Sequence, residues 1–430
     1  MNENRSIMKK VTIIFPGWIK APNGAAQFVF GLRSCINDFA NQGIELSTFT
    51  LDDVHGEVRN FSNNDKIKRK ASLKNKLMRY AKYSHLMTYA MIYFSGLRYS
   101  KRIVEAFDEI PNDELPDIIH FQDLFACYYY LKRKRKNKKS VYLTLHSNGS
   151  LWSMYEEYYP LFRSCFFGIM KRRIEDVALN RVDKVNFVAD FPRWNFCHLY
   201  PHISSQKTSF VYNGIPDIEG GSKCISSTNQ TRLVCVGTLC NRKNQIGILH
   251  ALSKLTSEQQ KSFSMTFVGD GPSRNILEKV AATLSADIYF VGNSNQVNDY
   301  LTNSDAFILF SKDEGLPISI IEAMRCGLPI ISTRIAGIPE MIVEGISGYL
   351  VDVDEQQLSE LFEKILIDRP DFVKMGEKSR IIYEEKFSQK AMILSYAKLW
   401  QKYKLKMTEP KRKVNPKRWK SISILHRWSI

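Results

Sequence analysis

The sequence predicts an α/β protein with two doubly wound parallel sheets that face each other across a cleft. Its 430 residues exceed what one hydrophobic core usually holds. Short apolar runs alternate with helix-length segments in both halves, and a segment rich in Gly, Ser, Asn and Lys at 214–230 separates the halves. We therefore expect domains at 1–212 and 213–387, a C-terminal helix at 388–406 that packs back on the first domain, and a basic tail at 407–430.

The first half opens with a βα unit. A strand is predicted over 9–16, a glycine-containing turn over 17–26, and a single helix over 27–43 that Gly43 ends. Further short strands, each an apolar run that ends in polar residues, are predicted within 116–123, 140–149, 184–190 and 208–216. Their alternation with helical segments gives the first domain a parallel sheet.

The second half repeats this alternation. Buried-strand patterns lie within 232–239, 264–272, 287–293, 305–311 and 329–333, each followed by a helix-length segment. Open parallel sheets bind ligands beyond the carboxyl ends of their strands. A ligand site is therefore expected in the loops that follow these strands.

Two carboxylates flank the helix predicted after the strand at 306–310. Glu314 lies in the loop at the carboxyl end of this strand, Pro317 fits the first helical position, and Gly327 ends the helix. Glu322 lies in the second turn, about 7 to 8 Å along the axis from Pro317. Taken alone, Glu314 is equally explained as a helix cap and Glu322 as an exposed helix residue.

The neighbouring residues favour a nucleotide-sugar site. Carboxylates accept hydrogen bonds from vicinal sugar hydroxyls, and the backbone N–H groups of the helix start suit a phosphate. Arg242 and Lys243 follow another strand and provide two cations for a diphosphate. Glycines after a third strand allow close approach of a nucleotide. The residues concerned are Gly269 and Gly271 in that loop, and Gly315, Leu316 and Ile318 at the helix start.

These motifs together resemble the retaining glycosyltransferases of family four, which have the GT-B fold. The resemblance rests on Glu314-x7-Glu322 within "EGLPISIIEAMRCGLPII", with "GTLCNRKN", "VGDGP" and "AGIPEMI" at matching intervals. It is dense from about 212 to 387 and looser in the first half, which in this family reads the acceptor. The fold it implies is GT-B, with a donor domain at 213–387.

The resemblance also implies roles for individual residues. Glu322 would bind the ribose hydroxyls, Glu314 the donor sugar hydroxyls, and Lys243 the diphosphate, while His146 would lie beside the transferred sugar. Gly24, within Asn-Gly-Ala, stands where the family has a Gly-Gly-Ala turn facing the diphosphate.

The sequence departs from the family pattern at two positions. Asn23 replaces the first glycine of the Gly-Gly-Ala turn, and Thr238 stands where many relatives have Arg. Arg242 is the cation available to compensate for Thr238. The Asp-x-Asp pattern of Asp352 and Asp354 is interpreted as structural, because GT-B enzymes usually stabilise the diphosphate with basic groups and a helix terminus.

The expected activity is therefore that of a retaining, metal-independent hexosyltransferase. The donor is expected to be a UDP- or GDP-linked sugar, without a cofactor, and the acceptor a glycan or lipid-linked glycan in capsule, exopolysaccharide or lipopolysaccharide synthesis. The alternative is a non-catalytic GT-B subunit that binds a glycan or a partner glycosyltransferase. That alternative predicts loss of Glu314, Glu322 or Lys243, and the sequence has all three.

Charge and cysteine usage bear on location. A formal charge of +17 indicates an anionic partner, and no nucleic-acid-binding motif accompanies it. The stretch 66–94 and the tail at 407–430 mix cations with aromatic and aliphatic residues, as surface-bound membrane segments do; a disordered end explains the tail equally well. Scattered cysteines and the lack of an apolar signal segment predict a cytoplasmic protein, peripheral on the inner face of the membrane.

Overall fold

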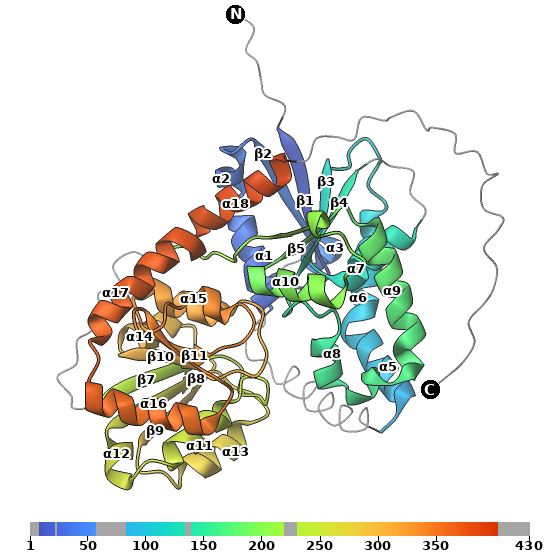
Figure 1. Ribbon diagram of the computed structural model, residues 1–430. Coiled ribbons are helices and arrows are strands. Elements are labelled where there is room, and N and C mark those ends of the chain that lie inside the picture. Colours follow the sequence, from blue (N-terminus) through green and yellow to red (C-terminus); the bar gives the residue numbers. More distant parts are fainter. Residues whose placement is uncertain (1–7, 22–23, 57–82, 134–138, 219–229, 403–430) are drawn as a thin grey trace, which may run out of the picture.

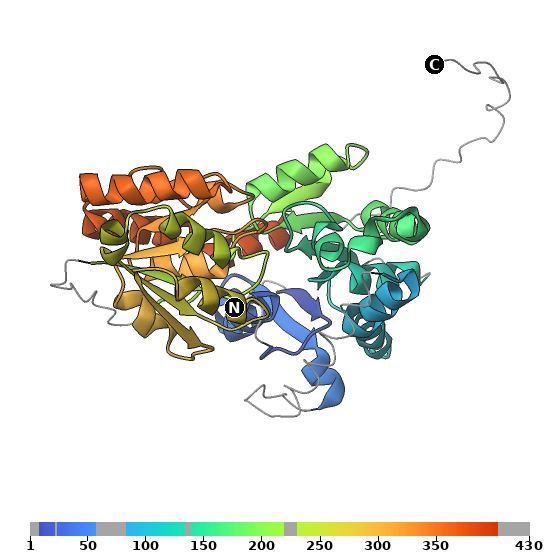
Figure 2. The ribbon, with the colours of Figure 1, turned by 90° about the horizontal axis from the view of Figure 1, so that it is seen from below.

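The computed structural model describes residues 8–21, 24–56, 83–133, 139–218 and 230–402. They form two α/β domains, each built on a six-stranded parallel sheet, and Figures 1 and 2 show the two sheets in separate halves of the molecule. The predicted fold class is confirmed.

The N-terminal sheet has the strand order β2-β1-β3-β4-β5-β6. The central strands β3 and β4 are buried throughout, since helices cover both faces of the sheet. The strands are β1 (Lys9–Phe15), β2 (Ile44–Thr50), β3 (Ile118–Phe121), β4 (Ser140–Leu145), β5 (Lys184–Phe187) and β6 (Thr208–Phe210). The helices are α1 (Gly24–Ser34), α2 (Ile36–Ala40), α3 (Leu51–His55), α5 (His85–Ile92), α6 (Arg98–Phe107), α7 (Leu124–Lys132), α8 (Ser153–Tyr158), α9 (Gly168–Arg181) and α10 (Asp190–Leu199).

Two local predictions in this domain were wrong or incomplete. The single helix predicted over 27–43 is two helices, because Cys35 leaves the helical region at φ −100°, ψ 13°, and α2 starts after it. Gly43 does close the segment, in a left-handed conformation at φ 73°. The strand β2 was not predicted: its alternation of apolar and polar residues is short and begins directly after this turn.

The C-terminal sheet has the order β12-β11-β10-β7-β8-β9. Its direction of winding reverses between β7 and β10, which are direct neighbours. This reversal is the topological switch point at which open α/β sheets bind ligands. The strands are β7 (Thr231–Val236), β8 (Phe263–Val268), β9 (Asp287–Gly292), β10 (Ala306–Leu309), β11 (Ile330–Thr333) and β12 (Gly348–Val351). The helices are α11 (Gln245–Ser253), α12 (Ser257–Lys261), α13 (Arg274–Ala281), α14 (Val297–Thr302), α15 (Ile318–Arg325), α16 (Glu355–Asp368) and α17 (Phe372–Ile382).

The chain crosses between the domains twice, and the two crossings run together. Ile215 pairs with Ser388 in a parallel bridge, and a Cβ on Gly214 would lie 2.4 Å from the Ser388 carbonyl oxygen. After the second crossing, α18 (Gln389–Gln401) packs into the core of the N-terminal domain (Figure 1). There Trp400 is fully buried and its indole N–H donates to Nδ1 of His120 at 3.2 Å.

No helix within the described ranges combines the length and the apolar character needed to cross a bilayer.

Candidate functional site

The switch point brings together the two loops in which the sequence predicted charged site residues. The loop 237–244 follows β7 and the loop 310–317 follows β10. The backbone N–H of Lys312 donates to the carbonyl oxygen of Arg242 at 2.8 Å, which ties the loops to each other. Their side chains therefore meet in a fixed geometry at the carboxyl ends of neighbouring strands.

Glu314 is the centre of this group. Its Oε1 lies 2.7 Å from the Lys243 ammonium and accepts a hydrogen bond from the Ser311 hydroxyl at 2.8 Å, while Oε2 lies 3.1 Å from Nη1 of Arg242. The residue is only 7% exposed. Burial alone would raise the pKa of Glu314, but the adjacent Lys243 and Arg242 outweigh it, so the pKa is lowered and the carboxylate is ionised at neutral pH.

Arg242 has a second anchor in the same loop. Its Nη1 also donates to the backbone carbonyl of Asp313 at 2.8 Å. Sequence analysis placed Arg242 and Lys243 towards a diphosphate and Glu314 towards a sugar. In the structure Glu314 contacts both Arg242 and Lys243 directly, because a buried carboxylate is most stable beside cations. An incoming anionic ligand therefore meets cations that are already positioned.

The start of α15 differs by one residue from the prediction. Pro317 is not the first helical residue but the residue before it, with an extended ψ of 119°, and Ile318 starts the helix. The Pro317 carbonyl accepts the N–H groups of Ile320 and Ile321 at 3.1 and 3.4 Å. The N–H groups of Ile318 and Ser319 come before these and have no acceptor inside the helix, so this end keeps its suitability for an anion.

Glu322 lies on α15 and is partly buried. Burial raises its pKa, and the nearby Arg325 acts in the opposite direction. No described contact links Glu322 to Glu314, so the structure places the two acids on one loop-helix unit without joining their side chains.

Glycines allow the loops around this group to approach each other. Gly269 has φ +137°, and a Cβ on it would lie 2.1 Å from the carbonyl oxygen of Gly237. No side chain fits there, so the β8 loop lies directly against the loop that leads to Lys243. Gly24, at the start of α1, has no described atom within 4 Å of where its Cβ would be, and no described contact joins it to the charged group.

The N-terminal domain contributes His146 from the end of β4. Its Nε2 lies 2.9 Å from Oε1 of Gln122, which fixes Nε2 as the donor and leaves Nδ1 as an acceptor. Burial lowers the pKa of His146 to about 4, so the ring is neutral at pH 7. The backbone of His146 abuts the C-terminal domain: a Cβ on Gly315 would lie 2.9 Å from the His146 carbonyl oxygen.

Asn148, Asp313 and Glu340, which the sequence analysis did not single out, join the domains here. Asn148 donates from Nδ2 to Asp313 Oδ1 at 2.8 Å, next to Glu314. Glu340, beyond β11, accepts the backbone N–H groups of Asp190 and Phe191 at 2.9 and 2.6 Å and so caps α10 of the other domain. Neither pair leaves a local signal in the sequence, since the partners are 165 and about 150 residues apart.

The Asp-x-Asp pattern has a structural use. Asp354 caps α16 by accepting the backbone N–H groups of Gln356 and Gln357, and Asp352 accepts from the Gln357 side chain at 3.3 Å. Within the described part of the chain, no three His, Cys, Asp or Glu side chains are grouped as metal ligands.

Two family models match the chain in succession. The model "Glycosyltransferase Family 4" matches residues 33–217, and "Glycosyl transferases group 1" matches residues 223–381. The two matched segments correspond to the two domains and together span most of the chain.

Individual relatives share less of their length. The chain is 28% identical over 177 residues to N-acetyl-alpha-D-glucosaminyl L-malate synthase of Bacillus anthracis, covering 40% of this chain and 46% of that protein. It is 29% identical over 169 residues to the amylovoran biosynthesis glycosyltransferase AmsK of Erwinia amylovora, covering 37% and 41%. These alignments thus span less than half of either relative.

Solved structures agree with the fold. The crystal structure of Anabaena HepE in complex with UDP and glucose superposes with a TM-score of 0.63 at 15% identity, over 92% of this chain and all of that one. By its two family models, its two facing parallel sheets and its charged group at the switch point, the chain belongs to the glycosyltransferases of family 4, with the GT-B fold.

Proposed function

We propose that the protein is a retaining glycosyltransferase that moves a hexose from a UDP- or GDP-linked donor to a glycan or lipid-linked acceptor in cell-surface polysaccharide synthesis. The observation that carries this proposal is the placement of Glu314 between Lys243 and Arg242 at the switch point of the donor domain. The polysaccharide assignment draws on the amylovoran biosynthesis role of the Erwinia relative, and the UDP donor draws on the HepE complex.

The proposed reaction breaks the bond between the anomeric carbon and the diphosphate oxygen. The bonding electrons leave with the diphosphate, and Lys243, Arg242 and the N-terminus of α15 stabilise the charge that develops there. The acceptor hydroxyl oxygen forms the new bond on the same face of the sugar, and its proton passes to the leaving phosphate oxygen. Neutral His146 is assigned to accept a hydrogen bond from a sugar hydroxyl through Nδ1.

A panel of nucleotide-sugars tests the donor assignment. We expect slow hydrolysis of one UDP- or GDP-sugar to the free nucleoside diphosphate, and about tenfold weaker donor binding in Glu322→Ala, because one ribose contact is lost. The core should stay intact, so the thermal midpoint should change by no more than a few degrees. Glu363→Ala, an exposed carboxylate on α16, is the matched control. No hydrolysis of any donor would favour the non-catalytic alternative, and unchanged donor affinity in Glu322→Ala would refute the ribose role.

The diphosphate charge is assigned to protein cations rather than to a metal ion. Hydrolysis should therefore proceed unchanged in an excess of EDTA, measured by release of nucleoside diphosphate at fixed ionic strength. A loss of turnover that manganese restores would contradict this assignment and would support a metal site at Asp352 and Asp354.

An anionic membrane surface is proposed as a partner, with the protein bound on its cytoplasmic side near a lipid-linked acceptor. The sequence support for this comes from 66–94 and 407–430. Residues 66–82 and the whole tail lie outside the described part of the chain. Of these two stretches, only residues 83–94 can be compared with the structure.

A further inference from the structure

An apolar surface patch lies on the N-terminal domain, on the helices α5 and α9. Leu86 is 77% exposed and Ile169 is 73% exposed, and between them lie other exposed aromatic side chains. The His85 ring packs on Phe166 with centroids 5.1 Å apart, which joins the start of α5 to the 3-10 turn Cys165–Phe167 that leads into α9. We call this surface the α5–α9 patch; its large exposed side chains are Leu86, Tyr89, Phe94, Phe166 and Ile169.

Helical geometry puts these side chains on common faces. On α5, Leu86 and Tyr89 are three residues apart and share a face, and Phe94 is exposed on the π-helical turn that follows. Ile169 shares its face of α9 with Arg172 and Arg173, three and four residues further on, and both arginines are exposed. Apolar and cationic side chains therefore alternate over one surface.

The two stretches that supply the patch carry only positive charge, although Arg163 and Lys101 ion-pair with Glu156 and Glu105 just outside them. The sequence has no acidic residue between Asp65 and Glu105, nor between Glu157 and Glu175, and these two stretches supply every member of the patch. Exposed cations lie within them at Arg98, Lys101, Arg102, Arg163, Arg172 and Arg173. The guanidinium of Arg98 lies 5.8 Å from the centre of the Phe94 ring, at the edge of the patch.

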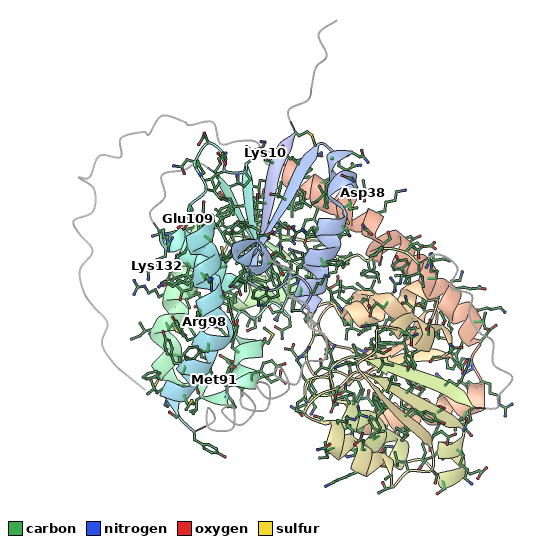
Figure 3. All side chains as sticks on the ribbon, turned by 180° about the vertical axis from the view of Figure 1, so that it is seen from behind. Lys10, Asp38, Met91, Arg98, Glu109 and Lys132 are labelled. Carbon is green, nitrogen blue, oxygen red and sulfur yellow. The ribbon has the colours of Figure 1, made fainter. Side chains whose placement is uncertain are left out.

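Figures 1 and 3 show where this surface lies. α5 and the start of α9 lie together at the end of the N-terminal domain opposite α18 (Figure 1). Figure 3, from behind, labels Arg98 and Met91 at this same end, away from the C-terminal domain. Met91 is buried, so α5 keeps one apolar face for the core and exposes a second.

We infer that the α5–α9 patch docks on an anionic lipid bilayer, with Leu86, Phe94, Phe166 and Ile169 at the acyl boundary and the surrounding cations on the headgroups. A soluble surface does not need two apolar faces on one helix, and the absence of acids across both stretches matches an anionic partner rather than an uncharged one. Aromatic and aliphatic side chains beside Lys and Arg are the composition of interfacial membrane contacts. The inference rests on the proposed membrane partner, locates its contact on the protein, and is independent of the donor chemistry.

The test compares two matched double variants of the full-length chain. Ile169→Ser with Arg172→Glu changes an exposed apolar residue and an exposed cation three positions apart on α9. Ile367→Ser with Lys364→Glu makes the same change on α16 of the other domain, where Ile367 is 80% exposed. Binding is measured by cosedimentation with phosphatidylglycerol vesicles and with phosphatidylcholine vesicles at low salt. Leu86→Ser provides a second, single-residue probe on α5.

We expect wild type to bind phosphatidylglycerol but not phosphatidylcholine vesicles. The α9 pair should weaken binding at least tenfold, Leu86→Ser several-fold, and the α16 pair less than twofold, with nucleotide-sugar hydrolysis unchanged in all. Equal binding by both pairs, or no vesicle binding by wild type, overturns the inference. A wild-type dimer that the α9 pair converts to monomer, or preferential binding to duplex DNA, would assign the patch to a different partner and equally overturn it.

Discussion

Replacing Lys243 with Ala should lower kcat by about 10²- to 10³-fold and raise the donor KM much less. The proposed leaving diphosphate gains negative charge towards the transition state, so an ammonium aimed at it stabilises the transition state more than the bound donor. Lys243 has the geometry for this role: it is only 12% exposed, and Glu314 holds its ammonium at 2.7 Å. Steady-state kinetics of donor hydrolysis and transfer measure both constants.

Two further variants make this result specific. Lys243→Arg keeps the charge and should retain more activity than Lys243→Ala. Lys312→Ala removes a neighbouring exposed cation of the same loop pair, whose ammonium hydrogen-bonds to the Asn241 side chain at 3.3 Å, and should leave kcat within about twofold. An increase in KM with kcat unchanged would show that Lys243 binds donor and transition state equally.

Glu314→Gln should reduce stability and turnover together while tightening the binding of free nucleoside diphosphate. The neutral amide removes the carboxylate that Arg242 and Lys243 share and leaves both partly buried cations close together, at a cost of about 3 kcal/mol. For a domain of this size the thermal midpoint should fall by about 6 to 12 °C. A diphosphate supplies the missing negative charge, so it should restore more of the midpoint in the variant than in wild type.

The same variant separates the two roles of Glu314. Binding of the complete nucleotide-sugar should improve less than binding of the free diphosphate, because the carboxylate that accepts the sugar hydroxyls is gone, and kcat should fall about 10²-fold. Glu363→Gln on α16 controls for the loss of one negative charge. If Glu314→Gln binds free diphosphate more weakly than wild type, the carboxylate does not compete with the phosphate for Lys243.

Low pH should remove part of the stabilisation by Glu314 in the wild-type protein. The pKa of Glu314 is lowered from its usual 4.5, so its ion pairs stabilise the fold above that pH, and the stabilisation is lost as the pH falls through the lower pKa of the folded state. The stability difference between wild type and Glu314→Gln, measured by thermal unfolding, should therefore shrink as the pH falls below about 4.

The sequence by itself determined the features that depend on near neighbours. Apolar runs and glycine turns located ten of the twelve strands, all but β2 and β12, since a buried parallel strand has a short continuous apolar sequence. Glu314 and Glu322 lie within nine consecutive residues, so the donor motif could be recognised from the sequence alone. Local errors arose where a backbone angle decided the outcome: Cys35 splits one helix, and Pro317 precedes rather than begins another.

Only the tertiary structure decided which of these local features meet. The strand order makes β7 and β10 neighbours, and that adjacency turns Arg242, Lys243 and Glu314 into one ion-paired group. The bond from Asn148 to Asp313 spans 165 residues, and the bond from Trp400 to His120 spans 280. Such contacts leave no periodicity or spacing in a single sequence, because they depend on how sheets are ordered and domains are joined. The α5–α9 patch also depends on the tertiary structure. Its members come from two distant stretches of the sequence, and the packing of the domain decides which of their side chains stay outside the core.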